Sequence, residues 1–538
     1  MKTRSKEIDP TRDADLRLDR RDLMKLGAGA VGMAALAAAP KAAGGQARGG
    51  QDAPPAPGSM RKPGEIAPFT MAGYKNDYGR LNGNGPMDDT TAKIVKWVHG
   101  FKETDVTPAA KKQFDRTMID SLAALVAGFE EEAPRLSAKV ASMARSTNSE
   151  KCTVLGYGIE TTPELATFVN GALLREVDFN DTEHGVHYSV LIPAALSMGE
   201  ALHRSGSEVM AAIVVGYEIS ATPAGHESVI AAMVAGKLMR LDEDRLANAL
   251  TMALTPHIAL NKGVGAMSMW KGLRSTEAVK CGVWAALLAR EGITGPPQPF
   301  EGRGGYWASQ KGGRGMLPNG MGRDFTLPLE SGALQMEENW FKRRPAEASS
   351  QGILYLMPEI RAWVGNPGDI SWLHIDTSYG NWEEICDAPK WDPRNRQTAD
   401  HSLPYITARA LLDGDVYLDS FNEEKYNEPA ARALLAKTSV AGVNGWVGLG
   451  AARITITKKS GESKWWDTYE GKRIVTDADY PPLTTEELKA KFDRSCNFRK
   501  VAPAQRDQAY KVWGNISELK DFGDAMKVMA KFGQPKPL

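Results

Sequence analysis

One short polar segment, residues 178–189, carries the side chains that proton transfer requires. Its sequence, DFNDTEHGVHYS, brings Asp178, Thr182, His184 and His187 within ten residues. Carboxylates and imidazoles at this density could bind a hard metal ion, or exchange protons with a substrate without a metal. The spacing fits a polar loop that caps the next helix equally well. We expect His184 to lie behind the site or at the surface.

Two lysines could bind an anion near these residues. Lys271 follows the apolar residues 267–270 (MSMW), which would place its ammonium group against a low-dielectric wall. Burial lowers the pKa of a lysine, and a bound carboxylate raises it again. Lys342 opens the basic triplet KRR before Pro345. Taken alone, each lysine also fits an ordinary surface cation whose stem packs against the protein.

A third polar cluster, DHSLPY at residues 400–405, lies at the predicted start of a helix. Tyr405 could donate or accept a proton there, or it could be a core tyrosine with a satisfied hydroxyl group. Together the three clusters suggest an enzyme that binds a carboxylate and moves protons without a metal.

The composition of the 538-residue chain argues against several other classes of protein. Its 66 Lys and Arg balance 66 Asp and Glu, so the net charge lacks the positive excess of a nucleic-acid binder. The four cysteines are more than 100 residues apart from one another, which argues against a zinc or iron–sulfur site built on cysteine pairs. No Walker-type phosphate loop is present. We therefore expect no cofactor, no metal and no nucleic-acid partner.

The N-terminus has the pattern of an export signal. Arg20-Arg21 precedes a weakly apolar stretch, residues 26–39, which is too short for the roughly 20 residues that span a bilayer. Such a charged, apolar and then Ala-rich order is typical of a signal peptide, and the paired arginines resemble a twin-arginine signal. We predict a signal at 1–43, a flexible linker at 44–87 that is rich in Gly and Pro, and a periplasmic mature protein free of the membrane. A frayed helix is the alternative.

Hydrophobic patterning predicts a helical segment, a mixed segment and a second helical segment. Residues 88–340 are dominated by helical periodicity, beginning with the start signal Thr107-Pro108. In residues 341–478, the stretches 370–377 and 452–457 alternate like half-buried strands. Residues 479–538 return to helix after a capping box at Thr484 and Glu487. The predicted fold class is α with α+β: a large helical domain closed by both chain ends, with a smaller inserted α+β domain.

Several blocks of the chain resemble the MmgE/PrpD family, which includes 2-methylcitrate dehydratase, cis-aconitate decarboxylase and iminodisuccinate epimerase. The blocks are GYGIETTPELATFVNGALLREVDFNDT, GEALHRSGSEVMAAIVVGYE, SMWKGLRSTEAVKCGVWAALLAREGITGPPQPFEGRGGYW, WFKRRPAEASSQ and RQTADHSLPYITARALLDGDV. Their order is that of the family, and the motifs WKG, GITGP, FEG, RPAE and DHSLPY are most similar to the 2-methylcitrate dehydratase branch.

The resemblance implies a helical domain joined to a smaller α+β domain, commonly in a homodimer, with a metal-free and cofactor-free active site in the cleft between the domains. From the chemistry of water elimination we expect His187 and Asp178 to act as an acid/base pair, Tyr405 to be a second proton donor or carrier, and Lys271 and Lys342 to hold carboxylates. The resemblance places the site at Asp178, Thr182, His187, Lys271, Lys342 and Tyr405. We expect Asp178, His187, Lys271 and Tyr405 as catalytic groups and Thr182, Lys342, Arg274 and His226 as substrate-binding groups.

Some positions depart from the family pattern. His187-Tyr188-Ser189 stands where His-Pro-Ser is usual, residues 217–241 form a shorter stretch than is usual, and Arg274 replaces a histidine. Glu347 stands where decarboxylase-like members carry a histidine, which argues against decarboxylation. The sequence therefore predicts a lyase that eliminates water from a 2-methylcitrate-like hydroxy acid. The alternatives are an epimerase or decarboxylase on a related acid, or a non-catalytic periplasmic protein that binds a carboxylate.

Overall fold

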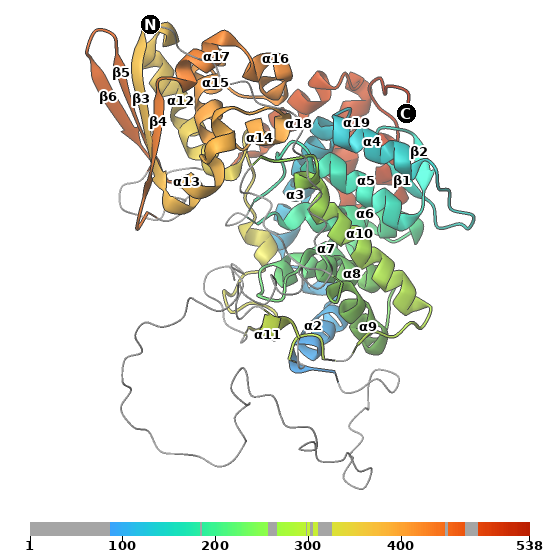
Figure 1. Cartoon of the computed structure of the whole chain (residues 1–538). Helices are drawn as coiled ribbons and strands as arrows, with labels where there is room; N and C mark the ends of the chain where they lie inside the picture. The colour runs from blue at the N-terminus through green and yellow to red at the C-terminus, as the bar shows by residue number, and fades with distance from the viewer. Residues whose placement is uncertain are drawn as a thin grey trace, which may run out of the picture. The chain divides into compact units, whose positions relative to one another are not determined.

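The structure, a computed structural model, describes residues 87–182, 186–256, 266–296, 298–301, 305–309, 325–446, 450–468 and 482–538. The predicted signal peptide, the linker up to residue 86, and His184 lie outside the described residues. The described chain is mostly helical with two small sheets, as the sequence predicts (Figure 1). None of its helices is both long enough and apolar enough to cross a lipid bilayer.

A first hydrophobic core is built from helices at both ends of the described chain. Its N-terminal helices are α2 (Asp89–Gly100), α3 (Pro108–Gly128), α4 (Glu132–Ala141), α5 (Pro163–Arg175), α6 (Ile192–Ala201), α7 (Gly206–Ser220), α8 (Glu227–Leu238), α9 (Glu243–Leu254) and α10 (Trp270–Arg290). Its C-terminal helices are α18 (Thr485–Phe498), α19 (Pro503–Trp513) and α20 (Gly523–Met529). A short hairpin, β1 (Cys152–Val154) and β2 (Ile159–Thr161), and a single helical turn, α11 (Tyr306–Ser309), complete the elements of this part.

The predicted helix starts are confirmed at two positions. Thr107 precedes α3 and its side chain accepts a hydrogen bond from the backbone N–H of Ala110. Thr484 and Glu487 form a reciprocal capping box at the start of α18. These contacts satisfy backbone N–H groups that have no partner within the first turn of a helix.

A second, separate core forms around a four-stranded sheet. The strand order is β4-β3-β5-β6, in which only the β3–β4 pair is parallel. Leu373 and Ile375 of β3 and Ile454 and Ile456 of β5 are buried, while the residues between them are more exposed. This alternation is expected of a sheet with one covered face, and Figure 1 shows the helices of this part on one side of the sheet. The elements are α12 (Gln351–Val364), β3 (Ile370–Ser378), α13 (Tyr379–Ile385), α14 (Arg396–Ala399), α15 (Leu403–Asp413), α16 (Glu423–Tyr426), α17 (Pro429–Leu435), β4 (Thr438–Val443), β5 (Ala452–Lys458) and β6 (Ser463–Asp467).

The two hydrophobic cores occupy different stretches of the chain, and the predicted domain boundaries stay predictions. The first core extends to Phe341 and resumes at Leu483, and the second runs from Ala346 to Trp466. Tyr417 and Leu418 lie within the predicted inserted domain but pack in the first core. The predicted boundary at 478 lies outside the described residues and stays a prediction.

One buried lysine of α18 joins segments that are distant in sequence. The Nζ atom of Lys491 donates hydrogen bonds to Asp120 Oδ1 at 2.6 Å, to the carbonyl oxygen of Phe179 at 2.7 Å and to that of Lys342 at 2.9 Å. It also lies 3.9 Å from the centroid of the Phe179 ring. All three donor positions of the ammonium group are therefore used. Helix α18 thus holds α3, the loop after α5 and the segment that carries Lys342 in place.

We expect Lys491→Met to lower the free energy of unfolding by about 3–5 kcal/mol, because it leaves Asp120 buried without its counter-charge. Chemical denaturation measures the change. Lys489→Met is the matched control on the same helix: its ion pair with Asp493 is partly exposed, so the loss should stay below about 1 kcal/mol. Equal losses in the two variants would contradict a structural role for the buried pair.

Candidate active site

The centre of the site is a buried carboxylate in an uncommon backbone conformation. Helix α5 ends at Arg175, and Asp178 follows with a φ angle of 50°. Aspartate is one of the few residues besides glycine that adopts this left-handed region readily. The side chain of Asp178 is 2% exposed. A buried charge of this kind persists only when other groups compensate it.

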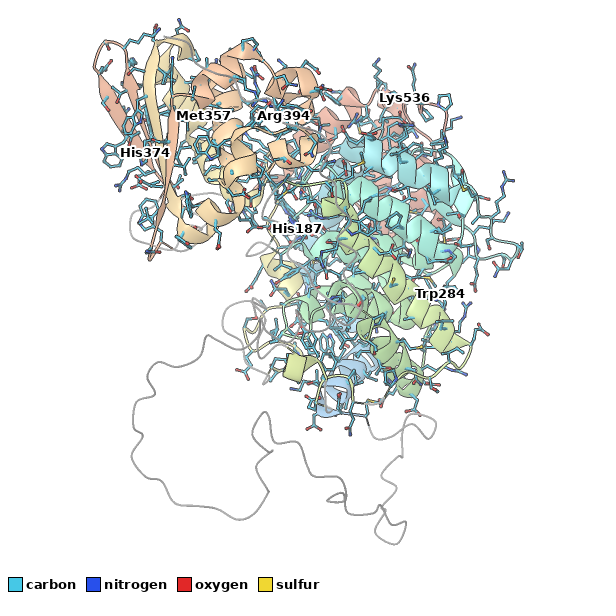
Figure 2. The ribbon with its side chains drawn as sticks, viewed as in Figure 1. His187, Trp284, Met357, His374, Arg394 and Lys536 are labelled. Atoms are coloured by element: carbon cyan, nitrogen blue, oxygen red, sulfur yellow. The ribbon has the colours of Figure 1, made fainter. Side chains whose placement is uncertain are left out.

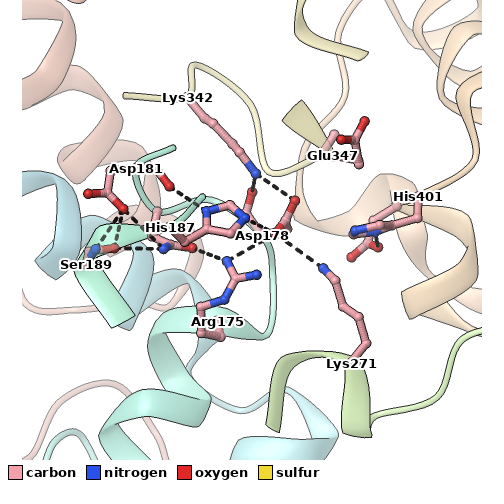
Figure 3. Close-up of polar contacts among 12 residues, drawn as sticks. Arg175, Asp178, Asp181, His187, Ser189, Lys271, Lys342, Glu347 and His401 are labelled. Atoms are coloured by element: carbon pink, nitrogen blue, oxygen red, sulfur yellow. Dashed lines mark hydrogen bonds and ion pairs between the residues drawn. The ribbon is translucent and has the colours of Figure 1, made fainter. Parts of the chain in front are cut away.

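Three cations surround the Asp178 carboxylate (Figure 3). Lys342 Nζ lies 2.6 Å from Oδ2 and also donates to the Asp178 carbonyl oxygen at 3.0 Å. Lys271 Nζ is 3.3 Å from Oδ1, and Arg175 Nη1 is 3.1 Å from the same oxygen. Burial alone would raise the pKa of Asp178, but the charges of Lys271, Lys342 and Arg175 outweigh it and hold that pKa well below its ordinary value. Asp178 is therefore ionised at neutral pH.

His187 lies beside this carboxylate. One of its ring nitrogens contacts a backbone oxygen, and the other is directed at Asp178. Its Nδ1 is 2.6 Å from the carbonyl oxygen of Asp181, a contact that assigns the proton to Nδ1. Its Nε2 is 3.6 Å from Asp178 Oδ1. Burial, with the charges of Arg175 and Lys342, holds the pKa of His187 well below its ordinary value. The ring is thus neutral, with a free lone pair on Nε2 that can accept a proton.

Asp181 holds the loop on which His187 sits. Its carboxylate accepts hydrogen bonds from the Tyr217 hydroxyl group at 2.7 Å, from the Ser189 N–H at 3.2 Å and from the Ser189 hydroxyl group. Figure 2 shows His187 near the middle of the described part of the chain, whereas Trp284 on α10, which is 51% exposed, lies toward the right of the view. The carboxylate of Asp181 is therefore occupied by these hydrogen bonds, and Asp181 helps to hold His187 in position.

Two residues of the second part of the chain face Asp178 from the side opposite His187 (Figure 3). His401 is 7% exposed, and its Nδ1 is 2.6 Å from Asp400 Oδ1. Burial and the neighbouring charge of Lys271 lower the pKa of His401 to about 4, so this ring is also neutral. Glu347 is tied to the same turn, because its backbone N–H donates to the Asp400 carbonyl oxygen at 3.0 Å. Burial raises the pKa of Glu347 to about 7.

Comparison with known families identifies the chain from both of its parts. Residues 92–316 match the MmgE/PrpD N-terminal domain, and residues 345–513 match the MmgE/PrpD C-terminal domain. The chain belongs to the MmgE/PrpD family. It is 25% identical to human cis-aconitate decarboxylase over 81% of this chain and 93% of that protein. It is 23% identical to the cis-aconitate decarboxylase-like protein oryM of Aspergillus oryzae, over 83% of this chain and 97% of that protein. Mouse cis-aconitate decarboxylase is 24% identical over 66% and 76% of the two chains.

Of the catalytic residues expected from the family resemblance, the structure brings Asp178, His187 and Lys271 together but not Tyr405. The Tyr405 hydroxyl group donates to the carbonyl oxygen of Ser420 at 2.5 Å, and the side chain is fully buried in the second core. Among the described residues Tyr405 has no contact with Asp178, His187 or Lys271, and its role as a proton carrier stays a prediction. Tyr405 lies within the first turn of α15 and packs toward Phe421, whereas His401 precedes that helix. The neighbouring Asp-His pair in DHSLPY was the signal that could have identified His401.

The expected substrate-binding residues divide into two groups. Lys342 and Thr182 belong to the Asp178 region: the Thr182 N–H donates to the Trp340 carbonyl oxygen at 3.0 Å, and its buried hydroxyl group has no hydrogen-bond partner among the described residues. Arg274 and His226 instead gather around Glu227 at the start of α8. Arg274 Nη2 is 2.6 Å and His226 Nε2 is 3.8 Å from the Glu227 carboxylate.

Within the described residues, no group of three or more His, Cys, Asp and Glu side chains is arranged to hold a metal ion. The expectation that neither a metal nor an organic cofactor takes part stays a prediction, as does the homodimer.

Polar contacts from the segment around α14 hold two parts of the site in place: the residues just after α5 and the segment before Lys271. Gln397 Nε2 donates to Glu176 Oε1 at 2.9 Å, immediately after α5. Thr398 Oγ1 accepts from the Met267 N–H at 3.0 Å, and Asn395 Nδ2 donates to the Met267 carbonyl oxygen at 2.7 Å. Met267 lies four residues before Lys271, so these contacts hold the chain segment that leads into that lysine.

Glu176 makes this junction sensitive to pH. Burial raises its pKa to about 8, against the opposing charge of Arg396, and in the unfolded chain the value is about 4.5. Between these two pH values the folded protein binds a proton that the unfolded chain has lost. The free energy of unfolding should therefore fall as the pH rises from about 4.5 to about 8, by at most about 1.4 kcal/mol per pH unit.

We expect Glu176→Gln to remove this part of the pH dependence, because glutamine does not titrate. Denaturant unfolding at pH values from 5 to 8.5 measures it as a flatter curve for the variant. Glu160→Gln, which changes an exposed carboxylate, should follow the wild type. Parallel curves for the wild type and Glu176→Gln would show that Glu176 does not carry the effect.

Proposed function

We propose that this protein is a lyase that eliminates water from a hydroxy polycarboxylate of the 2-methylcitrate class. The observation that carries the proposal is the imbalance of charge around Asp178. Arg175, Lys271 and Lys342 are positive, one carboxylate lies in contact with them, and His187 is neutral. A buried excess of positive charge favours an anionic ligand with more than one carboxylate.

Lys271 is the cation best prepared to bind that ligand. It is 6% exposed, and its Nζ forms no hydrogen bond among the described residues although it lies 3.3 Å from Asp178 Oδ1. An ammonium group has three donors, and a buried donor without a partner costs about 1–3 kcal/mol. A substrate carboxylate would satisfy these donors. The hydroxyl group of Thr182, which has no hydrogen-bond partner in the described part of the chain, offers a further donor in the same region.

The chemistry begins with His187. Its free Nε2 accepts the proton from the substrate carbon next to a carboxylate, and the negative charge that develops on that carboxylate is stabilised by Lys271 and Lys342. The electron pair of the broken C–H bond then forms a carbon–carbon double bond as the hydroxyl group leaves. Asp178 stays ionised and holds the two lysines, so its function is to position them.

Decarboxylation of a related acid is the second candidate, because the similar human, mouse and Aspergillus proteins are named for cis-aconitate decarboxylation. The same cations could hold a polycarboxylate for that reaction. Glu347, in a position where decarboxylase-like members of the family carry a histidine, favours dehydration.

We expect the purified protein to convert 2-methylcitrate or citrate to a product with the ultraviolet absorbance of a conjugated acid, without release of carbon dioxide. His187→Gln and Lys271→Met should each lower kcat/KM by about 100-fold or more, because each removes a group that acts in the transition state. The matched control is His203→Gln: this imidazole is 71% exposed and paired with Asp521, so turnover should be unchanged.

Other outcomes separate the alternatives. Carbon dioxide released from cis-aconitate would identify a decarboxylase. Inversion of a substrate stereocentre without new absorbance would identify an epimerase. Thermal stabilisation by these acids without any turnover would identify a binding protein.

We also propose that Arg20-Arg21 directs export through the twin-arginine pathway to the periplasm, on the sequence pattern alone. Replacement of both arginines by lysine should leave the full-length chain in the cytoplasm of a bacterial host, as measured by cell fractionation and immunoblotting. Arg12→Lys with Arg17→Lys is the control and should be exported normally. Normal export of the paired variant would contradict the proposal.

A further inference from the structure

Elimination of water requires an acid as well as a base, because hydroxide is a poor leaving group without a proton. The described imidazole and phenol groups near Asp178 have their protons engaged elsewhere. The Nδ1 proton of His187 is directed at Asp181, and the Nδ1 atom of His401 is paired with Asp400. The Tyr217 hydroxyl group donates to Asp181. If the proposed function holds, another group must therefore supply the proton to the departing hydroxyl group.

Glu347 occupies the position that such an acid requires. In Figure 3 it lies with His401 on the side of Asp178 opposite His187, and the ammonium group of Lys342 extends to Asp178. Its carboxylate accepts hydrogen bonds from Ser349 alone among the described residues: Oε2 from the Ser349 N–H at 2.8 Å and Oε1 from the Ser349 hydroxyl group at 3.2 Å. No described cation pairs directly with it. The group is thus held in place and retains the capacity to donate a proton.

We propose that Glu347 is the proton donor to the departing hydroxyl group, so that the base and the acid of the reaction come from opposite sides of the Asp178 cluster. His187 Nε2 removes the proton from carbon, and the C–H electron pair forms the double bond. The C–O bond breaks with its electron pair on oxygen, which takes the Glu347 proton and leaves as water. The imidazolium of His187 and the carboxylate of Glu347 then exchange one proton through solvent, which restores both groups.

The protonation state of Glu347 fits this function. Burial raises its pKa to about 7, opposed by the Ser349 N–H and by Lys342 and reinforced by Asp178 and Glu384. A substantial fraction is therefore protonated at neutral pH. Since the acid must carry its proton, kcat should fall as the pH rises through about 7.

The competing interpretation is that Glu347 only caps the helical turn at Ala348–Ser350 through Ser349. Glu347→Gln separates the two, because glutamine can still accept hydrogen bonds from Ser349 but cannot supply the proton. The decisive comparison uses the hydroxy acid that the wild type dehydrates and its analogue with fluorine in place of the departing hydroxyl group. Fluoride leaves as an anion and needs no acid.

We expect Glu347→Gln to lower the rate with the hydroxy acid by about 100-fold or more and the rate with the fluoro analogue by less than threefold. Glu347→Asp should restore part of the activity, together with the fall in kcat at high pH, which the residual rate of Glu347→Gln should lack. Glu462→Gln changes an exposed carboxylate that pairs with Lys458 and does not act on Glu347; it is the matched control, with both rates unchanged.

Equal losses with both substrates would show a structural role, and retention of both rates would show that another group supplies the proton; either result overturns the proposal. If the wild type eliminates water from no hydroxy acid, the proposed function itself fails. If the wild type is active and Glu347→Gln equals it, only the assignment of Glu347 fails.

Discussion

The arrangement of this site depends on one buried negative charge. Asp178 could not stay ionised away from water without the three cations that contact it, and the cations could not stay buried together without Asp178. The carboxylate therefore fixes two lysine ammonium groups and one guanidinium group within a few ångströms of each other. It also leaves an uncompensated positive charge. Under the proposed function, an anionic substrate would balance that charge.

The two hydrophobic cores make different contributions to this balance. The helical core supplies Arg175, Asp178 and His187 around the end of α5, and the buried pair of Lys491 and Asp120 holds that loop from behind. The sheet-containing part supplies Glu347 and His401, which both contact Asp400, Glu347 through the Asp400 carbonyl oxygen and His401 through the Asp400 carboxylate. Lys342 lies on the segment between the two cores. The chemistry proposed here uses this division, with the base on one part and the acid on the other.

The neutral imidazoles show how burial selects function. His187 and His401 each have one nitrogen directed at a fixed oxygen, and both are close to positive charge. Protonation of either ring would add a further cation to a region that already has an excess. Both rings are thus kept as bases, while burial has the opposite effect on the Glu347 carboxyl and keeps it as an acid near neutral pH. The same desolvation therefore favours the neutral form of both imidazoles and of the Glu347 carboxyl, which are the forms that the proposed reaction uses.

The sequence by itself determined the local features of this protein. It predicted the mostly helical fold with small sheets, the helix starts at Thr107 and Thr484, and the family, because caps and periodic apolar residues act over a few neighbouring positions. It also indicated the polar blocks that contain Asp178, His187 and Lys271. Only the tertiary structure decided which members of those blocks meet. Lys342 pairs with Asp178 across 164 residues, and Tyr405 turns into the second core while His401 faces the site. Such choices depend on burial and on charges from distant segments, which no local pattern of residues records.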